Sequence, residues 1–149
     1  MAESATERTT IDRPWQHCLE VALDFERYPE WARDVKSAEI LERDDEGRGL
    51  RVAYRATAMG RSARYTLRYD YEDEPARITW VLDQGDIVRR LDGQYRFEAV
   101  AGDPESTEVT YRLDVELAMP LPGFVKRRAE SKIMTTALNE LKRRCEADG

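Results

Sequence analysis

Hydrophobic and polar residues alternate with a period of two through most of the chain between residues 35 and 117. In "LRVAYRATA" the apolar and aromatic side chains fall on one face and the arginines on the other. The same alternation recurs in "ARYTLRYDY", "ITWVL", "RRLDGQYRFEA" and "TEVTYRLDVEL", and turn signals such as "DDEGRG", "DQGD" and "AGDPES" lie between the runs. With further strands over residues 5–12 and 35–42, this pattern predicts an antiparallel sheet of about seven strands with one face exposed to solvent and the other buried.

A helical period replaces the alternation at the two ends of the chain. After the first strand, "WQHCLEVAL" spaces its apolar residues by three and four, and a second helical turn is expected over "ERYPEW". From Phe124 onward the apolar residues fit an amphipathic helix of about 20 residues. Its apolar stripe comprises Val125, Ala129, Ile133, Ala137 and Leu141, with Met134 and Leu138 alongside. Its expected polar face carries Lys126, Arg127, Arg128, Lys132, Glu140, Lys142 and Arg143.

These elements suggest how the chain folds. Each predicted strand has one apolar face, and all of these faces must be covered. The C-terminal helix is the only long cover in the sequence. We therefore expect an α+β fold in which a strongly curved sheet wraps round this helix, with the two short helices closing one end. No repeat or linker divides the chain, so residues 1–149 are expected to form a single domain.

Composition and charge narrow the functional classes. The net charge of −6 opposes nucleic-acid binding, because a phosphate backbone requires a cationic surface. No apolar run approaches the ~20 residues needed to span a bilayer, and the N-terminal "MAESATERTT" has no hydrophobic stretch of signal-peptide type. Cys18 and Cys145 belong to no paired motif, so buried reduced thiols are favoured over a disulfide between them. We expect a cytoplasmic protein.

Several motifs are similar to those of a known family. "DFERYPEW", "YTLRYDYE", "LDGQYRF", "STEVTYRLDVEL" and "PLPGFVKRRAE" resemble the polyketide cyclase/dehydrase and coenzyme Q-binding branch of the START-like (SRPBCC) superfamily. The resemblance covers about Ile11 to about Arg144. It implies a helix-grip fold with an apolar cavity between helix and sheet, open near the loop after the first helices. Trp31 would lie near that mouth; the alternative is that Trp31 plugs one end of the core.

The inward faces of the strands are rich in aromatic residues. A core that only packs would favour Leu, Ile and Val, because a buried tyrosine hydroxyl needs a partner. Several tyrosines on one face therefore indicate a space filled by water or ligand, unless some hydroxyls reach water at the sheet edge. The candidate ligand-binding residues are Trp31, Tyr54, Tyr65, Leu67, Tyr69, Trp80, Tyr95, Tyr111, Phe124 and Ile133.

A basic cluster opens the last helix. Lys126, Arg127 and Arg128 stand where the helix dipole prefers anions. One interpretation is a small tolerated cost. The other is a basic rim at the pocket mouth that meets an anionic head group or membrane surface, with Leu121 and Phe124 dipping in.

The sequence offers few groups for catalysis. The only histidine, His17, lies beside the buried stripe of the first helix, and neither cysteine has a histidine partner suggested by sequence. No metal-ligand cluster or phosphate loop is present, so no metal or cofactor is expected. Aromatase/cyclase relatives use polar groups, including an arginine, inside the pocket. Here the strand arginines are expected to face outward and pair with acids across strands; they are Arg51, Arg55, Arg64 and Arg68.

Three functions remain open. The preferred one is non-enzymatic binding or transport of a hydrophobic small molecule, such as a lipid, an isoprenoid quinone or a polyketide-like compound. The second is a polyketide cyclase or dehydratase using the same cavity, with Tyr65 and Tyr95 as candidate catalytic groups. The third is a structural domain with a filled interior. Neither the ligand nor the oligomeric state follows from the sequence.

Overall fold

The computed structural model describes residues 5–58, 60–73, 76–119 and 121–147, so Pro120 and the first four residues of the polar N-terminal segment lie outside the described residues. The elements in chain order are β1 (Ala5–Ile11), α1 (Trp15–Leu23), a 3-10 turn η1 (Phe25–Arg27), α2 (Tyr28–Trp31), β2 (Val35–Arg43), β3 (Gly49–Ala58), β4 (Arg61–Asp73), β5 (Ala76–Gly85), β6 (Val88–Val100), β7 (Asp103–Leu117) and α3 (Gly123–Ala147). The alternating runs are strands, as predicted, and the two helical regions are confirmed.

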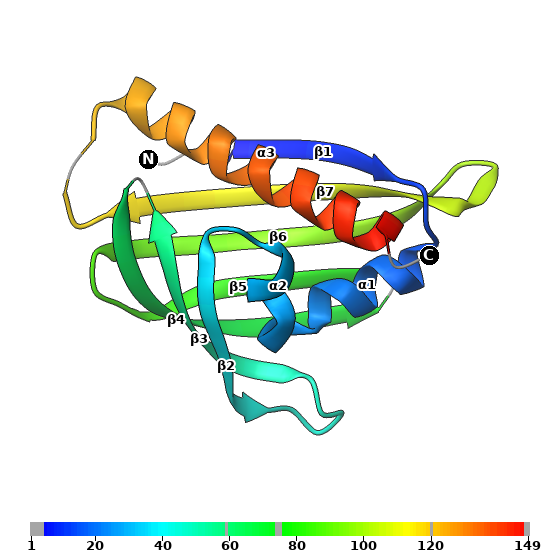
Figure 1. The fold of residues 1–149 in the computed structure, drawn as a ribbon, viewed down its shortest axis with the longest axis horizontal. Helices are drawn as coiled ribbons and strands as arrows, with labels where there is room; N and C mark the ends of the chain where they lie inside the picture. Colours follow the sequence, from blue (N-terminus) through cyan, green and yellow to red (C-terminus); the bar gives the residue numbers. More distant parts are fainter. Residues whose placement is uncertain (1–4, 59, 74–75, 120, 148–149) are drawn as a thin grey trace.

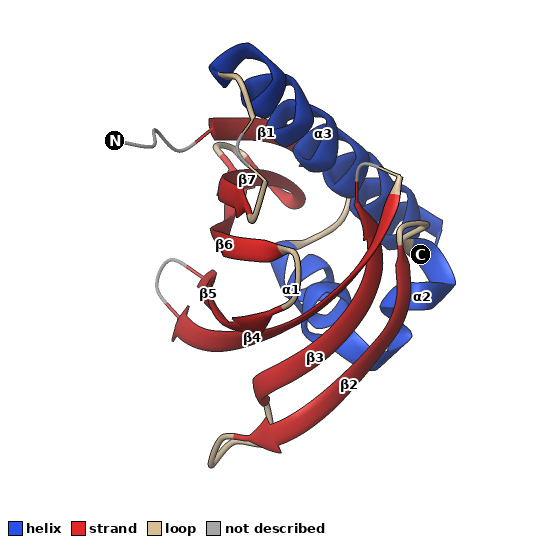
Figure 2. Cartoon of the chain, turned by 90° about the vertical axis from the view of Figure 1, so that its left-hand side faces the viewer, coloured by secondary structure: helices blue, strands red, loops and turns tan. Residues whose placement is uncertain are grey.

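One antiparallel sheet contains all seven strands in the order β1-β7-β6-β5-β4-β3-β2. Register shifts interrupt several strand pairs, and such irregularities increase bend and twist. The sheet curves around α3, which runs across its concave side (Figure 1), and the side view in Figure 2 shows the short helices along the same side. The predicted α+β helix-grip architecture is therefore confirmed.

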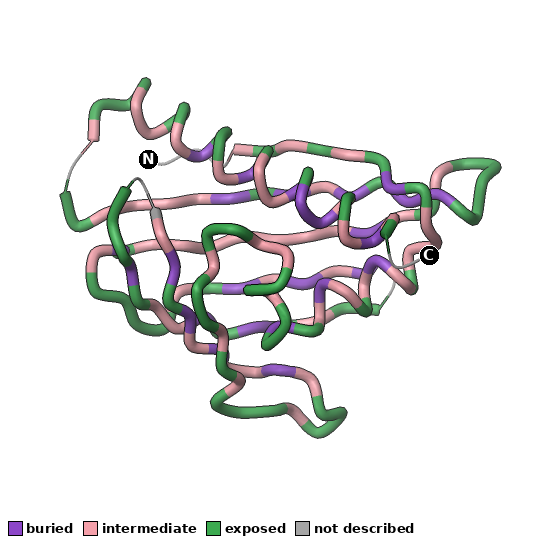
Figure 3. The backbone as a smooth tube through the Cα atoms, viewed as in Figure 1, coloured by how far each residue is buried: buried purple, intermediate pink, exposed green. Residues whose placement is uncertain are grey.

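The long helix α3 is 25 residues long, somewhat longer than predicted. Met134, Leu138, Leu141 and Cys145 are buried, and Figure 3 shows that burial is concentrated in the second half of the helix. One residue of the predicted polar face is placed differently: Glu140 is buried. Glu140 borders the apolar stripe, three residues after Ala137. The segment that follows α2 packs over its side chain there, and the Arg33 amide donates to its carboxylate.

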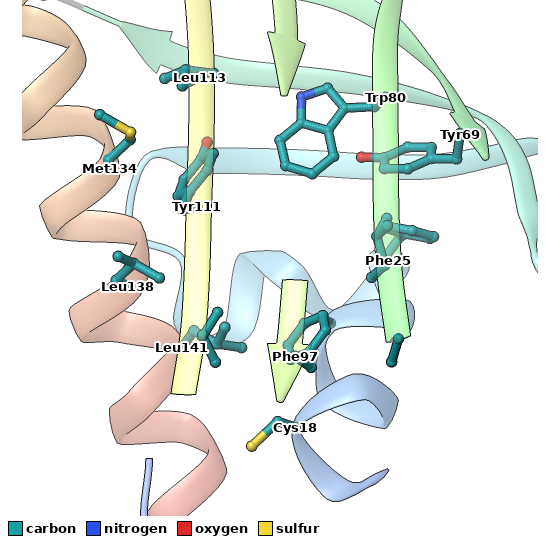
Figure 4. Packing of buried hydrophobic residues seen from close by; sticks show 14 of the residues in the cluster. Cys18, Phe25, Tyr69, Trp80, Phe97, Tyr111, Leu113, Met134, Leu138 and Leu141 are labelled. Carbon is teal, nitrogen blue, oxygen red and sulfur yellow. The ribbon is translucent and has the colours of Figure 1, made fainter. Parts of the chain in front are cut away.

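The end of the sheet next to α1 is tightly packed, and we call it the closed end. Cys18 of α1, Phe97 of β6 and Leu141 of α3 come together there (Figure 4), each at most 2% exposed. Cys18 and Cys145 are both buried thiols. His17 Nε2–H donates to the Cys145 carbonyl, 3.1 Å away, near the end of α3. The histidine thus supplies a donor to one of the carbonyls that have no partner within the helix.

No helix in the described ranges is long and apolar enough to cross a membrane.

Candidate functional site

A cavity of about 980 Å³ lies between the concave face of the sheet and the inner side of α3. No residue of α1 lines it, so it occupies the end opposite to the closed end. A dry void of that size would cost on the order of 20 kcal/mol at ~24 cal/mol per Å³. That exceeds the ~5–15 kcal/mol by which domains are stable. The cavity must therefore contain water or a ligand.

The predicted ligand-binding residues line this cavity with one exception. Its walls include Trp31, Tyr54, Tyr65, Leu67, Tyr69, Trp80, Tyr95, Tyr111 and Ile133. Phe124 is the exception: its side chain is 63% exposed and does not reach the cavity. The reason is helical geometry, because Phe124 is turned about 100° from Val125, which faces the cavity together with Ala129. Whether the lining residues bind a ligand stays a prediction.

The mouth of the cavity is marked by lining residues that are also exposed to solvent. They are Arg33, Asp34, Gly60, Arg89, Ala118, Met119, Arg128 and Lys132. The β3–β4 turn supplies Gly60, the start of β6 supplies Arg89, and the β7–α3 loop supplies Ala118 and Met119; all three segments lie at the left end in Figure 1. Trp31 is half-buried and lines the cavity two residues before the exposed Arg33, with its ring 4.9 Å from that of Tyr28 between centroids. Its place at the opening, which the resemblance implied, stays a prediction.

The aromatic wall depends on a glycine. Trp80 of β5 pairs with Gly93 of β6 in the register of the two strands. A Cβ atom on Gly93 would lie 2.5 Å from the Trp80 ring and 2.7 Å from the Arg112 carbonyl oxygen. Gly93 thus allows the indole to lie against the sheet, where its ring contacts Tyr95 and Tyr111 at centroid distances of 5.2 and 5.8 Å.

The tyrosine hydroxyls in the wall fall into two groups. Tyr54 and Tyr69 share a hydrogen bond of 2.6 Å between their hydroxyl oxygens. The hydroxyls of Tyr65, Tyr95 and Tyr111, in contrast, have no hydrogen-bond partner within the described part of the chain, and they are not sealed from the cavity. The second group can therefore donate to, or accept from, whatever occupies the cavity.

These tyrosines remain neutral at physiological pH. Burial raises the pKa of Tyr65 to about 12, with a smaller contribution from Asp34. Burial also raises the pKa of Tyr95, and the negative charge of Glu140 adds to the effect. The pKa of Tyr111 is raised by burial in the same way. Their hydroxyls are thus suited to orient a ligand by hydrogen bonding and are poorly suited to act as bases.

Glu130 of α3 is a cavity residue that the sequence did not indicate. It is 2% exposed and lines the cavity. Its Oε2 accepts a hydrogen bond of 3.0 Å from the Val115 amide and lies 3.8 Å from Lys126 Nζ. Val115 lies two residues beyond Leu113, which pairs with Ala5, the first described residue of β1, so Glu130 joins α3 to the part of β7 that follows this pair.

Glu140 is the second such residue. Its Oε2 accepts from the Arg33 amide at 3.2 Å and lies 3.7 Å from Arg33 Nε, and the residue is 8% exposed. It lines the cavity together with Tyr95. The only signal in the sequence is that both acids border the apolar stripe of α3. Charged residues are normally expected on the solvent side of a helix, and the backbone amides that bind these two acids belong to other segments of the chain.

The three predicted rim cations occupy different surroundings. Lys126 lines the cavity, but its Nζ lies 3.4 Å from Asp114 Oδ1 and 3.8 Å from Glu130 Oε2. Arg128 lines the mouth and is exposed, whereas Arg127 is exposed and outside the lining. Of these three cations, only the two arginines have no acidic partner among the described residues, so they offer unneutralised charge at this end of α3.

The strand arginines lie outside the cavity, as predicted, but most do not pair with acids. Arg51 binds Asp83 at 3.0 Å. No salt bridge holds Arg55, Arg64 or Arg68 in the regions that the structure describes. The register explains this, because it sets Arg51 opposite Arg68 and Arg55 opposite Arg64. The expected acid pairing was thus wrong for three of the four.

Comparison with known families gives one match across most of the chain. The sequence model of the family described as "Polyketide cyclase / dehydrase and lipid transport" matches residues 11–142. A search of curated proteins finds no significant match.

Solved structures with the same fold come from several bacteria. A START superfamily protein from Mycobacterium smegmatis has 23% identity and a TM-score of 0.91, over 98% of this chain and 99% of that one. A protein from Thermus thermophilus has 25% identity and a TM-score of 0.79, over 99% of both chains. The Zhui aromatase/cyclase from Streptomyces sp. R1128 has 19% identity and a TM-score of 0.81, over 98% and 94%. These likenesses extend over the whole fold.

Proposed function

Since the chain belongs to the polyketide cyclase/dehydrase and lipid transport family, we propose that it binds a hydrophobic small molecule in the cavity beneath α3. The observation that carries this proposal is a cavity of about 980 Å³ with an aromatic wall, too large to be left dry. Each Å² of apolar ligand surface removed from water contributes about 25 cal/mol. Lipids, isoprenoid quinones and polyketide-like compounds have the required apolar bulk, and their few polar groups can bond to the unpartnered tyrosine hydroxyls.

A pair of adjacent threonines on α3 tests the proposal. Thr136 lines the cavity, whereas Thr135 is exposed to solvent. Thr136→Trp should fill part of the cavity and lower the amount of co-purified or added apolar ligand at least tenfold, while Thr135→Trp should leave it unchanged. Native mass spectrometry and organic extraction of both variants measure the effect. Equal ligand content in the two variants, or no ligand and no uptake of apolar probes by the parent protein, would refute the proposal.

An enzymatic function is the second candidate. It is favoured by the unpartnered hydroxyls of Tyr65 and Tyr95 and by the fold shared with an aromatase/cyclase. Against it, the raised pKa values keep both tyrosines protonated, and the strand arginines lie outside the cavity. A cyclisation assay with a poly-β-ketone substrate analogue separates the two candidates. Turnover that is abolished by Tyr65→Phe or Tyr95→Phe would establish the enzyme and displace simple binding.

Contact with a membrane is a further part of the proposal. Phe124 is 63% and Met119 50% exposed, and both flank the mouth near Arg127 and Arg128. An apolar tip with adjacent cations suits an anionic lipid surface. Phe124→Ala combined with Arg127→Ala should reduce co-sedimentation with anionic vesicles several-fold. Val81→Ala combined with Arg55→Ala, an exposed pair on the outer sheet face, is the matched control and should have no effect. Absence of binding by the parent protein would remove this contact.

A further inference from the structure

Only two charged side chains are buried among the described residues, and both are carboxylates that line the cavity. They are Glu130 and Glu140, on the same inner side of α3. The cations of the lining are either exposed at the mouth or, like Lys126, paired with acids. Removing an ion from water costs several kcal/mol unless bonds within the protein replace its hydration. The buried charges of the lining are therefore both negative, and an anionic group placed beside them would be repelled.

Glu140 has unused capacity to accept hydrogen bonds. Its recorded interactions, with the Arg33 amide and Arg33 Nε, both use Oε2. Oε1 has no hydrogen-bond partner in the described part of the chain, although the side chain is more than nine-tenths buried. The head group of Arg33 is largely exposed, so water screens its charge from the carboxylate. One carboxylate oxygen of this cavity-lining residue thus remains without a partner in the described part of the chain.

A hydrogen-bond donor lines the same cavity as this acceptor. Tyr95 of β6 lines the same cavity, and its hydroxyl has no protein partner within the described ranges. Burial raises the pKa of Tyr95, and the negative charge of Glu140 adds to the effect, so the two side chains are within electrostatic range of each other. A carboxylate can only accept, while a neutral phenol can donate. An aliphatic or phenolic hydroxyl both donates and accepts, so it can satisfy the two groups at once.

Resting on the proposed function, we infer that Glu140 and Tyr95 form a polar subsite for a hydroxyl group of the ligand, which donates to Glu140 Oε1 and accepts from the Tyr95 hydroxyl. The ligand class is a hydrophobic alcohol or phenol, and a hydrophobic carboxylic acid is selected against. A purely structural role for Glu140, holding the Arg33 amide against α3, predicts no such selection. The amide of glutamine can still accept from the Arg33 amide, so Glu140→Gln removes the charge while keeping that contact.

Three fluorescent probes with one ring system test the subsite: 1-pyrenebutanol, 1-pyrenebutanoic acid and 1-butylpyrene. The parent protein should bind the alcohol at least tenfold more tightly than the acid at pH 8. In Glu140→Gln this ratio should fall about tenfold, mainly because the acid binds better. Tyr95→Phe should weaken the alcohol several-fold and leave 1-butylpyrene unchanged. Glu108→Gln is the matched control, because Glu108 is exposed and lies outside the cavity lining, and its ratio should equal that of the parent.

The outcomes separate the inference from the function on which it rests. If all three probes bind and the ratio of alcohol to acid is the same in the parent and Glu140→Gln, the subsite is wrong and the cavity still binds apolar ligands. If the parent binds the alcohol and the acid equally well, the pair does not select a hydroxyl group and the inference fails. If no probe binds, 1-butylpyrene included, the proposed function itself is refuted. Should Glu140→Gln fail to fold, the alcohol affinity of Tyr95→Phe decides the matter alone.

Discussion

The closed end of this protein and the opposite end, which holds the cavity and which we call the hollow end, are built from the same strands and the same helix. The closed end is packed, whereas the hollow end is open. On β6, Phe97 is 2% exposed among packed side chains, whereas Tyr95, two residues earlier on the same face, borders the cavity. On α3, Leu141 belongs to the closed end and Ala129 to the hollow end. The difference shows that the cavity requires no special secondary structure. It arises where α1 no longer lies beneath α3, and small α3 residues such as Ala129 and Ala137 are among those that line it.

The largest expected contrast comes from truncating the two aromatic residues of β6. Phe97→Ala leaves a hole in a packed region and should cost about 3–5 kcal/mol of unfolding free energy. Tyr95→Ala should cost only about 1–2 kcal/mol, because one side of its ring already faces open volume. Urea unfolding of both variants measures the difference. Equal losses would mean that the hollow end is as tightly packed as the closed end.

Alkaline pH should act on the hollow end through its tyrosines. The pKa of Tyr65 is about 12 in the folded protein and about 10 in the unfolded chain. Because the folded-state pKa is the higher one, the associated stability is complete below about pH 10 and is lost as the pH rises toward 12. Two pKa units correspond to about 3 kcal/mol for this residue.

Tyr65→Phe provides the measurement, because phenylalanine does not titrate. Urea unfolding between about pH 9 and pH 11.5 should show a shallower loss of stability in the variant than in the parent protein. The closed end supplies the control: Phe97→Leu alters packing and should leave the slope against pH unchanged. Identical slopes in Tyr65→Phe and the parent would show that Tyr65 is solvated in the folded protein.

The smallest contrast concerns two hydroxyl groups. Thr107 Oγ1 donates to the Arg13 carbonyl at 2.6 Å in the closed end, where Thr107 is fully buried. Thr107→Val should cost about 1–3 kcal/mol, because the carbonyl loses this buried donor. Tyr54→Phe breaks the bond to Tyr69 but should cost only about 0.5–1.5 kcal/mol, since cavity water can solvate the remaining hydroxyl. Thermal and urea unfolding compare the two, and a larger loss for Tyr54→Phe would imply a dry cavity.

Much of the fold could be predicted because periodicity is a local property. The alternation around Tyr54, Tyr65 and Tyr95 directs each of these side chains to the concave face, and the structure agrees. The same reasoning put the strand arginines on the outer face. The pairing of Arg55 with Arg64 did not follow, because register depends on where each turn begins.

The candidate site was predictable only in its aromatic wall. Phe124 was misplaced because a rotation of about 100° on a helix separates the cavity side from solvent, and sequence spacing alone does not fix that boundary. Lys126 was expected as a rim cation, but Asp114 of β7 and Glu130 hold it. Glu140 was assigned to the polar face for a similar reason, since the Arg33 amide that binds it lies 107 residues away in the chain.

The sequence by itself determined the strands, the long amphipathic helix and the aromatic face, because each of these depends on side chains a few residues apart. The tertiary structure decided which end is hollow, which acids of α3 enter the cavity and which cations remain unneutralised. Those features depend on the volume and the backbone groups that distant segments bring together, in particular α1 at the closed end and Val115 and Arg33 beside the buried carboxylates.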